Sequence, residues 1–159
     1  MKPSQCGLDY NGDSMQFTLE TTTQNYVIRA YTAHEVIVTP PEDLAENVKL
    51  VHDPRFGDQP VALELLSSSF YLAPRQLVKN WAPSQFENLE LEDFDTIIDN
   101  KPEILLLGTG SKLQWPKPGI REKLLGLGIG IEVMDSGAAC RTYNILMAEL
   151  RDVAALIFI

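Results

Sequence analysis

Apolar and polar positions follow their clearest pattern after residue 103, where continuous apolar runs alternate with segments of helical periodicity. The run EILLL at Glu103–Leu107 is typical of a strand buried on both faces. Ile120, Leu124 and Leu127 then recur at the spacing of one helix face. The order strand, helix, strand, helix, strand predicts right-handed crossovers and a parallel sheet in this half. The predicted elements are strands over Glu103–Leu107, Ile129–Met134 and Val153–Phe158, a helix from Pro118 to the glycines Gly126 and Gly128, and a helix over Ala138–Leu150 with Asp135 or Ser136 as N-cap.

Before residue 103 the pattern predicts short strands. Asn25–Thr32 and Glu35–Thr39 are rich in β-branched and aromatic residues, with Ala33-His34 as a tight connection between them. Val61–Leu66 and Ser69–Leu72 indicate a second pair of strands. Together with the parallel half, these pairs predict a mixed α/β layer structure.

Two helices and a surface segment complete the predicted organisation. A short helix is expected to open at Pro41 and to run to Leu50. A second helix presents Leu91, Phe94, Ile97 and Ile98 on one face and ends at residues 100–102. We interpret residues 40–60 as a surface insertion and residues 1–15 as a loose N-terminus. A length of 159 residues suits a single domain, 1–159.

The charge of the chain narrows the classes of partner. The formal net charge is −9, which argues against nucleic acid and against an anionic membrane surface. The surplus lies entirely in residues 1–103, with 17 acids and 7 bases, whereas residues 104–159 hold 5 acids and 6 bases. The C-terminal part is therefore close to neutral.

Cysteine content and targeting signals point to a reducing compartment. Cys6 and Cys140 are too few for a disulfide framework, and no Cys/His spacing resembles a metal site. The first residues show neither an apolar secretory core nor an arginine-rich mitochondrial presequence. The apolar runs are too short to span a bilayer. We expect a bacterial cytoplasmic protein without a cofactor.

The segment Gly108–Lys112, with sequence GTGSK, directly follows the EILLL strand. Ligands of open parallel sheets lie at the carboxyl ends of the strands, where glycines let backbone N–H groups approach an anion. The segment matches neither a Walker A loop nor the dinucleotide fingerprint. The alternative interpretation, which loop physics favours, is a tight turn.

The segment Asp135–Asn144 follows the next parallel strand and is expected at the same sheet edge. Ser136 and Arg141, near a helix N-terminus, are suited to hold a carboxylate or phosphate. The helix dipole and Arg141 would lower the pKa of Cys140, yet a lone cysteine among alanines is more often a buried apolar residue. Arg141 has a structural alternative as well, as a partner of Asp135 or of carbonyls at the sheet end. The candidate ligand-binding residues are Gly108, Thr109, Gly110, Lys112, Ser136, Arg141 and Asn144.

The strand–GTG segment and the stretch Ile131–Leu146, with "EVMDSGAACRTYN", carry a family resemblance. They resemble a family of domains of unknown function that includes mitochondrial complex I assembly factor 3 and bacterial homologues. The resemblance covers about Asn25 to Ile159 and implies one three-layer α/β domain with a mixed central sheet. It implies no established catalytic activity, and it suggests contact with a protein. Residues 40–60, and Leu150 where a glycine is expected, depart from the family pattern.

Three functions remain open, in this order. The first is a non-catalytic interaction or assembly-type protein that binds a protein partner or itself. The second is a small-anion-binding domain with its cleft between Gly108–Lys112 and Ser136–Arg141. The third is a cysteine-dependent enzyme that uses Cys140. Trp81 and Trp115 are expected as packing anchors, or as interface residues if they are exposed.

Overall fold

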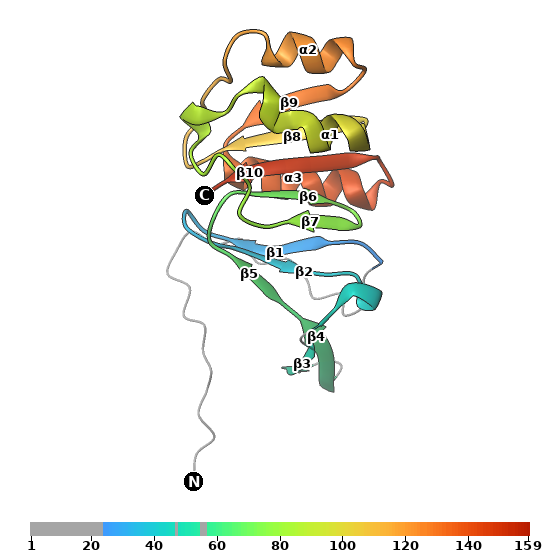
Figure 1. Ribbon diagram of the computed structural model, residues 1–159. Coiled ribbons are helices and arrows are strands. Elements are labelled where there is room, and N and C mark those ends of the chain that lie inside the picture. Colours follow the sequence, from blue (N-terminus) through green and yellow to red (C-terminus); the bar gives the residue numbers. More distant parts are fainter. Residues whose placement is uncertain (1–23, 47, 55–56) are drawn as a thin grey trace.

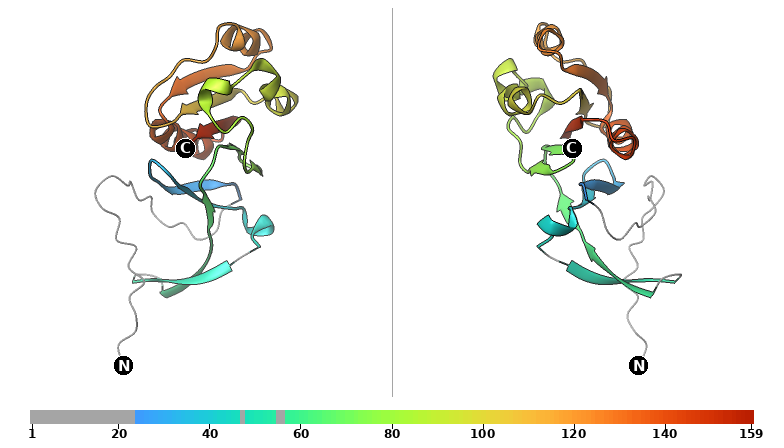
Figure 2. Two further views of the ribbon diagram at one scale, coloured as in Figure 1. Left: turned by 60° about the vertical axis from the view of Figure 1, so that its left-hand side comes forward. Right: turned by 90° about the vertical axis from the view of Figure 1, so that its right-hand side faces the viewer.

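The computed structural model describes residues 24–46, 48–54 and 57–159. The predicted loose N-terminus, 1–15, lies outside this range. The described residues form a mixed α/β structure in which helices and a small sheet cover the two faces of a central sheet (Figures 1 and 2).

The central sheet has five strands in the order β7-β6-β10-β8-β9. Strand β10 runs parallel to β8, and β8 runs parallel to β9, as the sequence predicts, whereas β6 and β7 are antiparallel. A single row of partners, Val133, Leu107, Leu156, Tyr71 and Val78, crosses all five strands. The strands are β6 (Phe70–Ala73), β7 (Gln76–Val78), β8 (Ile104–Thr109), β9 (Gly130–Met134) and β10 (Val153–Phe158).

Alternation along β10 divides the interior into two cores. Ala154, Leu156 and Phe158 face one core, and Val153, Ala155 and Ile157 face the other. All six side chains are buried, which explains why this strand has an uninterrupted apolar sequence. The first core lies under α1 (Asp95–Asn100), α2 (Ile120–Gly126) and the 3₁₀ turns η2 (Phe86–Asn88) and η3 (Leu91–Phe94).

The second core lies under α3 (Ser136–Ala148) and a three-stranded sheet in the order β1-β2-β5. Its strands are β1 (Val27–Tyr31), β2 (Val36–Thr39) and β5 (Glu64–Leu66). Strands β1 and β2 form the predicted antiparallel pair around Ala33-His34. The complete second core therefore joins one helix and two sheets.

The segment between β2 and β5 differs from its prediction. Pro41 opens only the 3₁₀ turn η1 (Glu42–Leu44), and the chain then forms a two-stranded hairpin of β3 (Val48–Asp53) and β4 (Gly57–Ala62). The predicted helix to Leu50 is wrong because residues from Val48 onward gain a strand partner in β4. The hairpin extends away from the rest of the molecule (Figure 1). Its status as an insertion stays a prediction.

The second predicted strand pair is also wrong. Residues 61–66 divide at Leu63 between β4 and β5, and β5 pairs with β2. Strand β6 pairs instead with β10 and β7. The sequence spacing suggested a hairpin, but burial of Phe70 and Leu72 against the second core places β6 in the central sheet.

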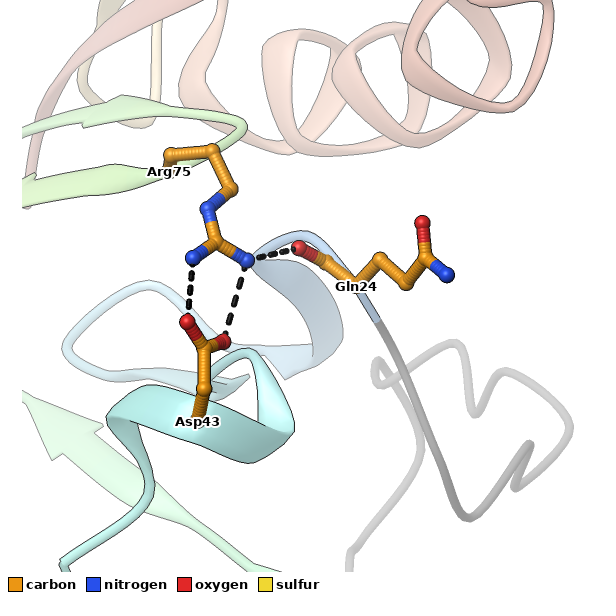
Figure 3. Close-up of polar contacts among 3 residues, drawn as sticks. All are labelled: Gln24, Asp43 and Arg75. Atoms are coloured by element: carbon orange, nitrogen blue, oxygen red, sulfur yellow. Dashed lines mark hydrogen bonds and ion pairs between the residues drawn. The ribbon is translucent and has the colours of Figure 1, made fainter.

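A three-residue polar contact fixes η1 to the body (Figure 3). Arg75, after β6, donates to both carboxylate oxygens of Asp43, at 3.0 and 2.5 Å, and to the backbone oxygen of Gln24 at 2.7 Å. The guanidinium lowers the pKa of Asp43 through this hydrogen bonding. The contact ties together the start of β1, the turn after β6 and the approach to the hairpin.

Close packing between β8 and α3 can be tested at Gly108. A Cβ at this position would lie 2.8 Å from Cδ1 of Ile157 and 3.1 Å from Cβ of Ala139. We expect Gly108→Ala to lower the free energy of unfolding by about 1–3 kcal/mol, the usual cost of overpacking. Gly126→Ala is the matched control because its added Cβ meets nothing within 4 Å. Urea unfolding followed by circular dichroism measures both, and a Gly108→Ala midpoint equal to wild type would contradict the packing.

Candidate functional site

The structure brings the glycine segment Gly108–Lys112 into direct contact with the start of the helix at Ser136. The N–H of Ser136 donates to the carbonyl of Gly110 at 2.8 Å, and the N–H of Gly110 donates to Oγ of Ser136 at 2.9 Å. Oγ of Ser136 also donates to the carbonyl of Phe158 at 2.5 Å. One serine thus joins the ends of β8 and β10 to the start of α3, so its hydroxyl and the Gly110 N–H have partners within the fold.

Thr109 closes the loop that follows β8. Its side chain is 1% exposed, and its Oγ1 lies 2.8 Å from the carbonyl of Lys112. The same oxygen accepts from the N–H of Gln114 at 3.0 Å. The GTGSK segment therefore contains a turn held by its own hydroxyl, while the Lys112 side chain remains at the surface.

Arg141 and Asn144 point away from this loop and toward β1. Arg141 donates to the hydroxyl of Tyr31, and its guanidinium carbon lies 5.7 Å from the centre of the same ring. Oδ1 of Asn144 accepts from the N–H of Ile28 at 3.0 Å, and Nδ2 donates to the Ile28 carbonyl at 2.7 Å. Both residues therefore fasten β1 to α3.

Cys140 lies in the second core with no exposed surface. Burial raises its pKa to about 12, and the opposing effect of Arg141 is smaller. The buried apolar role, which the sequence favours for this cysteine, is confirmed, and the alternative of a pKa lowered by Arg141 and the helix dipole is wrong because desolvation of the thiolate dominates. Asp135 provides the N-cap of α3, accepting from the N–H of Ala138 at 2.8 Å.

A cleft of about 820 Å³ lies at the carboxyl ends of β8 and β10. It includes three of the predicted site residues, Thr109, Gly110 and Lys112. Ser136, Arg141 and Asn144 do not line it. Four separate segments form its walls: Ala33 and His34, Ser84–Glu87, Thr109–Gln114, and Phe158 with Ile159. Sequence reasoning missed the first two segments, since a tight turn and a proline-flanked loop gave no sign that they would meet the GTGSK loop.

The two tryptophans have different environments. Trp81 is 7% exposed and packs on Tyr71, with ring centres 5.5 Å apart, which confirms a packing role. Trp115 is 65% exposed, and Leu113 on the same loop is 53% exposed and lines the cleft. The loop after β8 thus presents large apolar side chains to solvent beside a concave surface.

Two further features concern metals and membranes. In the part of the chain that the structure describes, no three His, Cys, Asp or Glu side chains gather as a metal site would require. None of the helices among these residues is both long and apolar enough to cross a bilayer. The cytoplasmic location stays a prediction.

A family model and several curated proteins match this chain. The family described as "Protein of unknown function (DUF498/DUF598)" matches residues 56–158. A "13 kDa major membrane protein" of Francisella tularensis subsp. holarctica is 35% identical over 71 residues, 45% of this chain and 58% of the relative. The "NADH dehydrogenase (ubiquinone) 1 alpha subcomplex assembly factor 3" of Xenopus tropicalis is 30% identical over 80 residues, 49% of this chain and 44% of the relative. The chain thus spans about half the length of these curated relatives.

Solved structures extend the likeness over almost the whole chain. A Xanthomonas campestris protein determined by NMR matches with a TM-score of 0.64 and 28% identity, covering 91% of this chain and 92% of that protein. This coverage is larger than that of the curated relatives, which match 45% and 49% of this chain.

Burial of Cys140 predicts slow labelling with a definite dependence on pH. In a chain carrying Cys6→Ser, Cys140 is the sole thiol. We expect a thiol reagent at about pH 8, near the ordinary thiol pKa, to modify it no faster than the protein unfolds, and at once in denaturant. Labelling of the folded protein that outpaces unfolding would contradict the burial.

The raised pKa of Cys140 also makes stability fall at alkaline pH. An unfolded thiol ionises near pH 8.5, whereas the folded thiol ionises near 12, so the stabilisation is present below about pH 8.5 and is lost toward pH 12. The slope is about 1.4 kcal/mol per pH unit over that window. The free energy of unfolding is measured against pH for the parent chain and for Cys140→Ala. The difference between the two removes the contribution of tyrosine ionisation, which both chains share. A difference that does not change with pH would contradict the raised pKa.

Proposed function

This chain belongs to the DUF498/DUF598 family of proteins of unknown function, and on that premise we propose that it is a non-catalytic protein of the assembly type, which binds a partner protein. Two considerations support the proposal. Relatives from several vertebrates carry the name of an assembly factor. In addition, most of the chemistry-bearing side chains of the segment Asp135–Asn144 have partners within the fold: Asp135, Ser136, Arg141, Tyr143 and Asn144.

The observation that carries the proposal is the exposure of Trp115. A tryptophan that is 65% exposed leaves a large apolar ring in water. It follows directly after Gln114, which lines the 820 Å³ cleft together with Leu113. Tryptophan is enriched among the residues that dominate binding energy at protein interfaces, where neighbouring side chains exclude water. The loop after β8 is therefore the proposed centre of the partner-binding surface.

The charges around this loop favour an acidic partner surface. Residues 110–126 hold Lys112, Lys117, Arg121 and Lys123 against the single acid Glu122. Lys117 forms an ion pair with Glu90, and the other three cations are exposed. An apolar centre with a basic border fits a partner that offers an apolar side chain among carboxylates.

Replacement of Trp115 tests this function. The tagged full-length chain and its Trp115→Ala variant are used to recover partners from the source cell after mild cross-linking, and the recovered protein is then purified for calorimetry. We expect Trp115→Ala to raise the dissociation constant by about thirtyfold, which corresponds to the loss of about 2 kcal/mol of binding free energy.

Leu150→Ala is the matched control, since Leu150 is 89% exposed but lies after α3 and outside the cleft. It should bind like wild type, and both variants should unfold at the wild-type temperature. Equal affinities for wild type and Trp115→Ala, or recovery of no protein partner by wild type, would contradict the proposal.

A second candidate function is the binding of a small anion, favoured by the size and position of the cleft. Its volume of about 820 Å³ lies within the range of small-molecule sites, and the carboxyl ends of parallel strands are their usual location. Lys112 and His34 line it together with the acid Glu87. We propose Lys112, rather than Arg141, as the residue that would contact the anion, because Arg141 is engaged with Tyr31.

A screen of carboxylates and phosphate esters by thermal shift and native mass spectrometry tests this second candidate. A bound anion should raise the unfolding temperature of wild type and of Lys123→Ala, a control on α2. Lys112→Ala should lose about tenfold in affinity, as removal of one charge-assisted contact predicts. A screen without any stabilising anion, or an unaffected Lys112→Ala, would count against it.

A further inference from the structure

The hairpin of β3 and β4 projects from the body as an arm (Figures 1 and 2). Strand β3 makes its extensive contacts with β4 and with no other element among the described residues. A two-stranded hairpin standing alone in water is at best marginally stable. An additional surface that covers the arm would therefore stabilise it.

One face of the arm is apolar, and its two side chains from β3 are exposed. Val48 lies opposite Ala62, and Leu50 lies opposite Pro60, so these four side chains share a face of the hairpin. Val48 is 57% exposed and Leu50 is 73% exposed. Strands of soluble proteins normally place such residues against a core, whereas the described residues leave Val48 and Leu50 largely uncovered.

The apolar face continues into a groove at the base of the arm. Ala62 belongs to both, and the groove, of about 390 Å³, is also lined by Leu44, Leu63 and Leu65. These three leucines are 42, 44 and 58% exposed. Strand β5, which carries Leu65, is an edge of its three-stranded sheet. We name the residues Leu44, Val48, Leu50, Leu63 and Leu65 the arm strip.

Polar contacts hold both ends of the arm strip. Asp43, next to Leu44, is held by Arg75, which also binds the Gln24 carbonyl (Figure 3). Toward the tip, Nδ1 of His52 lies 2.8 Å from a carboxylate oxygen of Asp58 on the facing strand. The exposed leucines and valine therefore belong to an anchored surface.

We propose that the arm strip is a self-association surface, which a second copy of this chain covers across a twofold axis. A twofold interface needs one patch that complements itself, and this patch contains both a protruding arm and a groove beside it. In the pair, Val48 and Leu50 of each copy pack at the groove of the other. This inference is independent of the function proposed for the loop after β8.

Charge at the border of the arm strip favours a second copy as the occupant. The whole chain carries −9, so two copies repel each other over most of their surfaces. Among the described residues at the border of the strip, Glu64 pairs with Lys79 and Asp43 pairs with Arg75. The exposed acids Glu42 and Glu46 and the exposed base Lys49 remain. A twofold axis can place Lys49 of one copy beside Glu46 of the other.

Analytical ultracentrifugation of the full chain over a range of concentrations tests the proposal. We expect a monomer–dimer equilibrium that Leu65→Lys and Leu50→Lys each weaken by about tenfold or more, since each places an unpaired charge in an apolar contact. Ile145→Lys is the matched control, because Ile145 on α3 has the same 58% exposure as Leu65 and lies outside the strip. It should leave the equilibrium unchanged.

A charge exchange keeps the test informative if a lysine variant fails to fold. Glu46→Lys and Lys49→Glu should each weaken the dimer, and the double variant should restore it by rebuilding the same contact with reversed signs. A wild-type chain that remains monomeric at the highest concentration, or a dimer that all these variants leave intact, would overturn the proposal. Neither outcome changes the effect expected of Trp115→Ala on partner binding. The proposed self-association and the proposed partner binding can therefore be refuted independently.

Discussion

The whole arrangement depends on helix α3 filling the space between the central sheet and β1. One side of α3 places Ala139, Cys140 and Tyr143 in the second core with Leu106, Ala155 and Ile157. Its polar side chains also bind the backbone of β1, which is an edge strand among the described residues, since the Asn144 amide pairs with both the N–H and the carbonyl of Ile28. Tyr143 adds a hydrogen bond of 3.2 Å to the carbonyl of Tyr26. A buried backbone group without a hydrogen-bond partner is costly. These side-chain hydrogen bonds therefore stabilise the packing of the small sheet against α3.

The attachment of α3 to its neighbours explains the presence of residues that, in the sequence alone, resemble a reactive site. Ser, Cys, Arg and Asn near a helix N-terminus are the residue types of anion binding and nucleophilic catalysis. Here Ser136 joins three segments, Arg141 contacts Tyr31 and Cys140 is a small buried side chain. Their hydrogen-bonding capacity is used within the fold, whereas the cleft with its exposed loop and the arm strip are open among the described residues.

The family assignment and the mixed α/β class that the sequence indicated are confirmed. The reason is local: EILLL specifies a strand buried on both faces, and the spacing of Ile120 and Leu124 specifies a helix with one buried side. The same reasoning failed at Pro41–Leu50, where a proline and two acids suggested a helix. Residues from Val48 onward form a strand because they pair with β4, which comes later in the sequence. The edge position of β5 and the membership of β6 in the central sheet likewise depend on partners that are distant in sequence.

The sequence by itself determined which segments form the parallel half and that Gly108–Lys112 and Ser136 meet at one sheet edge. Only the tertiary structure decided that Arg141 and Asn144 turn to β1, and that His34 and Glu87 share a cleft with Lys112. The physical reason is that hydrophobic periodicity reports which side of an element is buried, but not which element covers it. The direction of a polar side chain is set by the partner that satisfies its hydrogen bonds, and burial of Cys140 by a neighbouring sheet outweighs the local dipole and charge.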